Sequence, residues 1–524
     1  MKATHSKLIL TLCLILNITF FMTVSEIAYG GDSEESTDEQ KPRVINVHQT
    51  ESTSTDDVDV LREDIQDAPP KLIDILMGRL ELHLAKRRVL ALDGGGMRGA
   101  FTIKVLAQLE QDTELPIGEL FKGSITGTST GSFIALGLLS SYKNGQANAG
   151  PYSAKEILEF YKTRARHMFS GCCAFDNCTK SLVCPTSISG KLRCFFKSIF
   201  SCCGCCGCCY NCGGLCGPKY TRKAIDEELQ TLLGTKTRLN ELLGPVQVTT
   251  YDISRGGGVV RLSSTDPQTN QYLVWQTAAA SSSAPTYYPS VVIGDGDIVP
   301  KRLGVDGGLA ENTPVLPAIE QAIQSTGDGA DITDFTVVSI GTGQAAGAFN
   351  DEELQYAGAV SWARPAVEIS MEGTSMATNL SFGQVFKHAN YYRIQSALSE
   401  RLLEMDNPDN VEGLLKEAIK VCGDQDSQYQ KFLKRCKVEK AFISNFRRLY
   451  GDLDDDVFME MLYQFVELVG VTHEETRLKL INLTSTHDSV VEKGPFATQV
   501  THFFNDTRLL KALKLEISHL LKGP

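Results

Sequence analysis

The sequence predicts an α/β fold with a mainly parallel central sheet. Between about residues 88 and 395, short apolar runs rich in β-branched residues alternate with longer stretches whose apolar residues recur every three or four positions. This alternation is typical of βαβ units, in which a helix joins two parallel strands. The chain has 524 residues, of which 42% are hydrophobic, and can therefore bury a large core.

The N-terminal 30 residues are predicted to be a signal peptide. Lys2 and Lys7 precede an apolar run at residues 8–24, and the small residues Ala28 and Gly30 follow on either side of Tyr29. The run is long for a signal core and short for a membrane span, so an uncleaved membrane anchor is the alternative. A signal peptide predicts the secretory pathway, with a secreted or a vacuolar, lysosome-like location.

Residues 31–70 are predicted to form an acidic, disordered linker. Twelve acidic and three basic residues between positions 31 and 67 give this stretch a net charge of −9, out of −12 for the whole chain. It has few large apolar residues with which to offset the entropy of ordering. The rest of the chain is close to neutral, which argues against nucleic acid as a partner. The mean hydropathy of −0.11 excludes a polytopic membrane protein.

The predicted elements follow the linker in order. Apolar spacing predicts a helix over residues 72–84 and another over residues 133–139. The predicted strands are residues 89–92, 124–126, 246–250, 259–262 and 335–340. After residue 396 the pattern becomes helical, and the predicted C-terminal extension (396–524) includes helices at 412–421, 457–469 and 507–521.

The first motif is D-G-G-G-M-R-G at residues 93–99, directly after a predicted strand. Glycines at the start of a helix leave backbone N–H groups accessible, and the helix N-terminus favours negative charge. Three of these glycines also fit the G-x-G-x-x-G pattern of dinucleotide-binding proteins. That alternative needs an acidic residue at the end of the next strand, whereas Asp112 and Glu114 follow a predicted helix.

The second motif is G-T-S-T-G at residues 127–131, between a predicted strand and a predicted helix. This setting is typical of a nucleophile elbow, in which flanking glycines permit a sharp turn at the serine. The pattern makes Ser129 the candidate nucleophile. A serine hydroxyl is a weak nucleophile and requires a base.

The third motif supplies a candidate base, Asp306, in V-D-G-G at residues 305–308. Alone, an Asp-Gly-Gly sequence is usually a turn. A Ser–Asp–His triad is the alternative, and His487 and His519 follow Asp306 in the chain order that such a triad needs. Neither histidine lies in a glycine-flanked loop, and we expect each to be an ordinary surface or core residue.

These three blocks, in this order, resemble the signature blocks of the patatin-like phospholipase family. Two further segments lie where that family has them, A-P-T-Y-Y-P at residues 284–289 and V-S-I-G-T-G at 338–343. The resemblance implies a three-layer patatin-like fold, with the hydrolase domain at residues 88–395. It also implies a lipid acyl hydrolase of phospholipase A or esterase type, acting on acyl esters of membrane lipids with no cofactor or metal.

The resemblance assigns roles by position. Ser129 would be the nucleophile, Asp306 the base of a Ser–Asp dyad without histidine, and an acyl-enzyme the intermediate. The oxyanion hole would be formed by the backbone N–H groups of the glycine loop, assisted by one arginine: Gly94, Gly95, Gly96 and Arg98. Ser132 departs from the family pattern, which usually has a second glycine there, and we expect little harm. The alternative from another class is a catalytically silent lipid-binding or scaffold protein on this fold.

A Cys-rich insertion at residues 171–219 interrupts the predicted hydrolase domain. Thirteen of the sixteen cysteines lie between positions 172 and 216. A disulfide-linked surface loop is the preferred interpretation, and a thiolate metal cluster is the second. The third is peripheral membrane contact, since residues 171–223 carry seven basic residues and one acidic residue, together with several phenylalanines.

Overall fold

The computed structural model describes residues 71–170, 218–327, 330–345, 359–386 and 390–458, together with positions 512, 515 and 516. All of them belong to the compact unit Pro69–Pro524. Several predictions fall wholly or mainly outside the described residues: the signal peptide, the acidic linker, the Cys-rich insertion and the helices at 457–469 and 507–521. The alternative triad histidines, His487 and His519, also lie outside them.

In the described part of the chain, the central sheet has eight strands in the order β11-β9-β1-β2-β5-β8-β7, with β6 also paired to β5. The pairings of β11, β9, β1, β2 and β5 along this order are parallel, whereas β6 and β8 are antiparallel to β5, and β7 is antiparallel to β8. The strands of this sheet are β1 (Arg88–Leu92), β2 (Ser124–Thr128), β5 (Val246–Asp252), β6 (Val259–Ser263), β7 (Val291–Ile293), β8 (Arg302–Asp306), β9 (Thr336–Ile340) and β11 (Tyr391–Ile394). Short two-stranded pairs are formed by β3 (Tyr142–Lys143) with β4 (Gln146–Ala147), and by β10 (Gln344–Ala345) with β12 (Ala397–Leu398).

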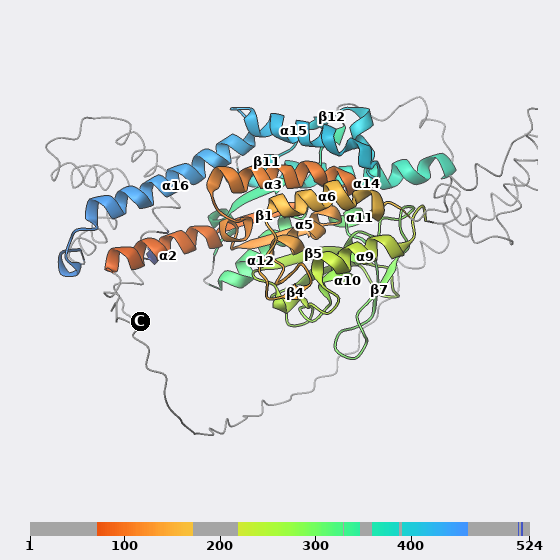
Figure 1. Cartoon of the computed structure of the whole chain (residues 1–524), viewed down its shortest axis with the longest axis horizontal. Coiled ribbons are helices and arrows are strands. Elements are labelled where there is room, and N and C mark those ends of the chain that lie inside the picture. The colour runs from red at the N-terminus through yellow and green to blue at the C-terminus, as the bar shows by residue number, and fades with distance from the viewer. Residues whose placement is uncertain are drawn as a thin grey trace, which may run out of the picture. The chain divides into compact units, whose positions relative to one another are not determined.

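The helices lie on both faces of the sheet (Figure 1). The α-helices are α2 (Leu72–Lys86), α3 (Gly99–Thr113), α4 (Ile117–Leu120), α5 (Thr130–Leu138), α6 (Ala154–Met168), α9 (Arg222–Leu233), α10 (Val274–Ser281), α11 (Gly308–Glu311), α12 (Val315–Thr326), α14 (Ala359–Val385), α15 (Val411–Gly423) and α16 (Gln428–Tyr450). Short 3₁₀ helices are η1 (Gly96–Arg98), η2 (Leu239–Glu241), η3 (Ile332–Asp334), η4 (Glu400–Leu403) and η5 (Pro408–Asn410).

Strand β1 shows how the layers form, because side chains alternate between the two faces of a strand. Leu90 and Leu92 belong to the large core that includes α3, α5 and α6. Val89 and Ala91 belong to a second core that includes α12. The predicted three-layer α/β fold with a mainly parallel sheet is therefore confirmed.

The first and last described helices pack against each other. The apolar residues of α2 form a core with Ile443 of α16 and with Phe458. The helices predicted at 72–84 and 412–421 are confirmed as α2 and α15. In the described ranges, no helix combines the length and the apolar character needed to cross a membrane.

Two cysteines lie in these helices, Cys422 in α15 and Cys436 in α16, and both are buried free thiols. Burial raises the pKa of each thiol to about 12. Neither thiol is therefore a nucleophile at neutral pH. The disulfide-linked loop predicted for the other cysteines lies outside the described residues.

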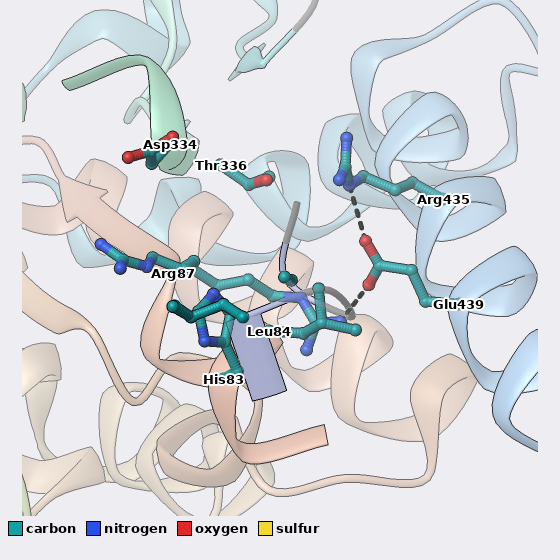
Figure 2. Close-up of a pocket in the computed structure, with 10 residues that line it drawn as sticks. His83, Leu84, Arg87, Asp334, Thr336, Arg435 and Glu439 are labelled. Atoms are coloured by element: carbon teal, nitrogen blue, oxygen red, sulfur yellow. Dashed lines mark hydrogen bonds and ion pairs between the residues drawn. The ribbon is translucent and has the colours of Figure 1, made fainter. Parts of the chain in front are cut away.

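A buried ion network joins β1 to α16 (Figure 2). Arg88 donates to one carboxylate oxygen of Glu439, and Arg435 Nε lies 2.9 Å from the other. Burial alone would raise the pKa of Glu439, but the two guanidinium groups hold it below its ordinary value. One buried carboxylate thus interacts with the buried guanidinium group of Arg88 and the half-buried one of Arg435.

We expect Glu439→Gln to lower the free energy of unfolding by about 3–5 kcal/mol, because it leaves the buried guanidinium group of Arg88 without the charge of Glu439. Denaturant unfolding measured by circular dichroism gives this value. The matched control is Glu114→Gln, which removes the solvent-exposed partner of Lys440 on the same helix. Equal, small losses in both variants would contradict the prediction.

Candidate active site

Ser129 lies between β2 and α5 with a backbone φ of 53° and ψ of −121°. A positive φ is unfavourable for a residue with a side chain and marks a strained turn. The flanking glycines allow this turn. A Cβ on Gly127 would lie 2.2 Å from the carbonyl oxygen of Gly131, and a Cβ on Gly131 would lie 2.3 Å from that of Leu92. The local structure is that of a nucleophile elbow.

The meeting of Ser129 and Asp306 follows from how their strands pair with β5. Strand β2 pairs with the first half of β5, where Thr128 lies opposite Thr249. Strand β8 pairs with the second half, where Asp306 lies opposite Thr250. Because β6 pairs with β5 along both halves, β2 and β8 share the other edge of β5. Their ends meet there, and the register brings Ser129 next to Asp306.

The two side chains form a direct hydrogen bond. Ser129 Oγ donates to Asp306 Oδ2 over 2.7 Å, and the backbone N–H of Gly308 donates to Asp306 Oδ1 over 2.8 Å. Ser129 is 6% exposed and Asp306 is 1% exposed. Burial raises the pKa of Asp306 to about 6, although the hydrogen bonds from Gly308 and Ser129 oppose the increase. This pKa leaves the carboxylate ionised at neutral pH and more basic than an ordinary aspartate.

Ser132 occupies the position at which we expected a harmless departure from the family pattern. Its side chain is fully buried, and its Oγ donates to the carbonyl oxygen of Ser129 over 2.6 Å. The serine therefore adds a hydrogen bond to the first turn of α5 and fits within the elbow.

The glycine loop connects β1 to η1 and lies against the elbow. A Cβ on Gly94 would lie 3.0 Å from Ser129 Cβ. The N–H of Gly94 donates to the carbonyl oxygen of Asn312 over 3.2 Å, so it departs from the expected role as an oxyanion donor. The N–H groups of Gly95 and Gly96 have no partner among the residues that the structure describes. These two N–H groups are the ones that a ligand could use.

Arg98 holds the glycine loop from the side. Its Nε donates to the carbonyl oxygen of Gly95 over 3.4 Å, and its Nη1 donates to that of Gly343 over 3.3 Å. Burial lowers the pKa of Arg98, while Glu372 and Glu368 oppose the decrease. Arg98 does not line the pocket that contains Ser129 and Asp306. These contacts indicate that Arg98 stabilises the conformation of the loop.

Two supports of the site come from distant parts of the chain and were missed from the sequence. Arg393 forms a two-point ion pair with Asp93, with distances of 2.9 Å and 2.6 Å, and thereby anchors the start of the glycine loop. Ser281 accepts a hydrogen bond from the backbone N–H of Ser129 over 2.8 Å and donates to the carbonyl oxygen of Thr249 over 2.7 Å. No local motif marks either residue, because Arg393 lies 300 positions from Asp93 and Ser281 lies 152 positions from Ser129.

An apolar pocket opens at the Ser129–Asp306 pair. Its empty space is about 680 Å³, including the part that is open to solvent. The wall is mostly aromatic and aliphatic and includes Phe133, Tyr161, Met168, Phe169, Ile225, Leu229, Tyr288 and Met371. No histidine of the described chain lines it, and no cluster of metal-ligating side chains occurs in the described residues. A buried serine with a basic partner, in an apolar pocket that Gly96 also lines, can attack an ester that carries an apolar chain.

Comparison with known proteins also supports a lipid hydrolase. The family model described as Patatin-like phospholipase matches residues 90–172 and 209–319, which include the glycine loop, the elbow and Asp306. Patatin-like protein 2 of Arabidopsis thaliana is 28% identical over 339 residues, covering 59% of this chain and 75% of its own. Patatin-like protein 1 of the same plant is 26% identical over 362 residues, covering 63% and 79%.

A bacterial relative matches a shorter stretch. The cGAMP-activated phospholipase of Escherichia coli (strain TW11681) is 26% identical over 267 residues, covering 49% of this chain and 62% of its own. The family model and these relatives support lipid acyl hydrolase activity in general terms. The motifs, the fold and the comparisons agree: residues 90–172 and 209–319 form a domain similar to the patatin-like phospholipase family.

Proposed function

We propose that this protein hydrolyses acyl esters of membrane lipids, as a phospholipase A or esterase, through a Ser129–Asp306 dyad. The observation that carries the proposal is the 2.7 Å hydrogen bond from Ser129 Oγ to a buried Asp306, at a strained elbow facing an apolar pocket. A surface turn would not require a serine with positive φ or a desolvated carboxylate. Such features concentrate at catalytic sites.

Acylation begins when Ser129 Oγ attacks the ester carbonyl carbon and its proton passes to Asp306 Oδ2. The carbonyl oxygen becomes an oxyanion, which the N–H groups of Gly95 and Gly96 receive. As the intermediate collapses, the bond to the leaving alcohol breaks and the protonated Asp306 returns a proton to the alkoxide. The acyl chain is then esterified to Ser129.

Deacylation uses the same groups in reverse. Asp306 accepts a proton from a water molecule, whose oxygen attacks the acyl carbon, and the oxyanion again binds the glycine N–H groups. Collapse of this intermediate releases the fatty acid, and Ser129 Oγ recovers its proton from Asp306. A single carboxylate thus serves as base and then as acid in each half-reaction, for which a raised pKa is suited.

The apolar pocket supports a lipid substrate, because an acyl chain gains about 0.8 kcal/mol for each CH₂ group that it buries. We place the activity in lipid catabolism. The location in the secretory pathway and the peripheral membrane contact predicted from the sequence are part of the same proposal. They depend on residues 1–30 and on the Cys-rich insertion.

The test combines covalent labelling with product analysis. A fluorophosphonate probe reacts with an activated serine, and we expect it to label the wild-type protein but not Ser129→Ala. Mass spectrometry of phospholipid vesicles should detect fatty acid release only with the wild type. The matched control is Ser282→Ala, a serine of the same pocket whose Oγ donates to the carbonyl oxygen of Ala278. Labelling and release that persist in Ser129→Ala would overturn the dyad, and their absence from a folded wild type would favour a silent lipid-binding protein.

The raised pKa of Asp306 predicts the dependence of activity on pH. Only the ionised carboxylate can accept the serine proton, so kcat/KM should rise as the pH passes through about 6. Below that point we expect a loss of about tenfold per pH unit. A soluble short-chain ester is the substrate of choice, because vesicles change with pH. A flat profile between pH 4.5 and 8 would contradict this role for Asp306.

A further inference from the structure

The carbonyl groups of Gly94 and Gly95 are held by hydrogen bonds, whereas the N–H groups of Gly95 and Gly96 have no partner in the described part of the chain. Thr342 Oγ1 donates to the carbonyl oxygen of Gly94 over 2.9 Å. Arg98 Nε donates to the carbonyl oxygen of Gly95. Each of these carbonyl groups belongs to a peptide unit whose N–H is on the next residue, Gly95 or Gly96.

A planar trans peptide directs its C=O and its N–H to opposite sides. The hydrogen bond from Thr342 therefore fixes the peptide unit between Gly94 and Gly95, with the N–H of Gly95 pointing away from Thr342. Without this bond, the unit joins two glycines and can rotate at low cost, because glycine tolerates most backbone conformations. The direction of the Gly95 N–H thus depends on the hydroxyl of Thr342.

Thr342 is itself firmly placed. It follows β9 and is 3% exposed. The N–H of Gly341 donates to the carbonyl oxygen of Ile394 over 2.9 Å, and the N–H of Gly343 donates to Gln395 Oε1 over 2.6 Å. A Cβ on Gly95 would lie 2.2 Å from Thr342 Oγ1, which shows how closely the threonine packs on the loop.

We propose that Thr342 is a positioning residue for the oxyanion hole, acting through the Gly94 carbonyl to direct the N–H of Gly95 at the developing negative charge. This inference rests on the proposed function. The loop must be oriented before the reaction, because donors fixed in advance stabilise the transition state without the cost of reorganisation. Thr342 does not line the pocket that contains Ser129 and Asp306, so its effect on the reaction must pass through the loop.

The test compares Thr342→Val with Thr342→Ser on a soluble short-chain ester. Valine keeps the shape of the side chain but removes the hydroxyl, so we expect kcat to fall about 10- to 100-fold while KM changes less than about threefold. Serine keeps the hydroxyl and should retain kcat within about threefold. Thr342→Ala is a second variant that lacks the hydroxyl, and we expect the same decrease in kcat. It provides the test if Thr342→Val does not fold.

Three results would overturn the inference. A Thr342→Val or Thr342→Ala protein with wild-type kcat would show that the hydroxyl does not orient the loop. A serine variant as impaired as valine would indicate a packing role, as would a parallel loss of kcat and of ground-state binding. Ser129→Ala in the same assay separates failure of this inference from failure of the dyad. If Ser129→Ala is inactive while Thr342→Val is fully active, the role of Thr342 is refuted and the proposed function still holds.

Discussion

Asp306→Asn should lower kcat by about 10⁴-fold while the protein stays folded, since loss of the proton-accepting group in a serine hydrolase has effects of this order. Asparagine has nearly the same shape and can still accept the hydrogen bond from the N–H of Gly308. It cannot take the proton of Ser129. Initial rates on a soluble ester, with fluorophosphonate labelling as a second measure, give the result.

The same substitution should make the protein more stable at neutral pH. The pKa of Asp306 is about 6 in the folded state and near 3.8 for an ordinary aspartate. The folded state therefore binds this proton more tightly than the unfolded state, and stability falls as the pH rises from about 4 to about 6. Above pH 6 the full penalty is on the order of 3 kcal/mol, which the neutral asparagine avoids.

Asp252 provides the matched control, because it is also buried and lies at the end of the neighbouring strand β5. Burial alone would raise its pKa, but hydrogen bonds from Ser254, Leu303 and Arg302 hold the pKa below the ordinary value. Asp252→Asn should therefore lower stability at neutral pH and retain most of the activity. A stable, active Asp306→Asn protein would contradict the assignment of the base.

The parts of the site that consist of a few adjacent residues could be predicted from the sequence. The elbow needs Gly127 and Gly131 around Ser129 because a side chain at either glycine would collide with backbone atoms, and this requirement is visible as a motif. The glycine loop can be recognised as a motif for the same reason, since a Cβ at Gly94, Gly95 or Gly96 would also collide with neighbouring atoms. Helices with a regular apolar stripe, such as α2, were likewise predictable from spacing alone.

The parts that depend on contacts between distant residues could not be predicted. The antiparallel strand β8 contains Arg302 and Gly304 and lacks a continuous apolar run, so it was not among the predicted strands. The ion pair of Asp93 with Arg393 and the hydrogen bond of Thr342 to the loop each join positions more than 200 residues apart. Nothing in the local composition of either segment marks its partner. The engagement of the Gly94 N–H by Asn312 is a tertiary contact of the same kind.

We expect the second large loss of activity from Gly131→Ala, because Gly131 of the elbow lies against the start of the glycine loop. An added Cβ would lie 2.3 Å from the carbonyl oxygen of Leu92 and 2.8 Å from that of Asp93, both backbone atoms at the end of β1. Either the elbow or the loop must then move, and a displacement of about 1 Å at reacting groups costs about 100-fold in rate.

Because Ser129 and the oxyanion donors lie on the two sides of this contact, we expect kcat to fall about 10³-fold, with stability also reduced. Kinetics on a soluble ester and thermal unfolding should be measured together. The matched control is Gly78→Ala, a helical glycine of α2 around which no atom lies within 4 Å of the added Cβ. It should slightly stabilise the protein and leave kcat unchanged, because alanine is the better helix former. Wild-type activity in Gly131→Ala would show that the close approach of elbow and loop is not needed for the reaction, and the oxyanion donors would then have to be sought elsewhere around Ser129.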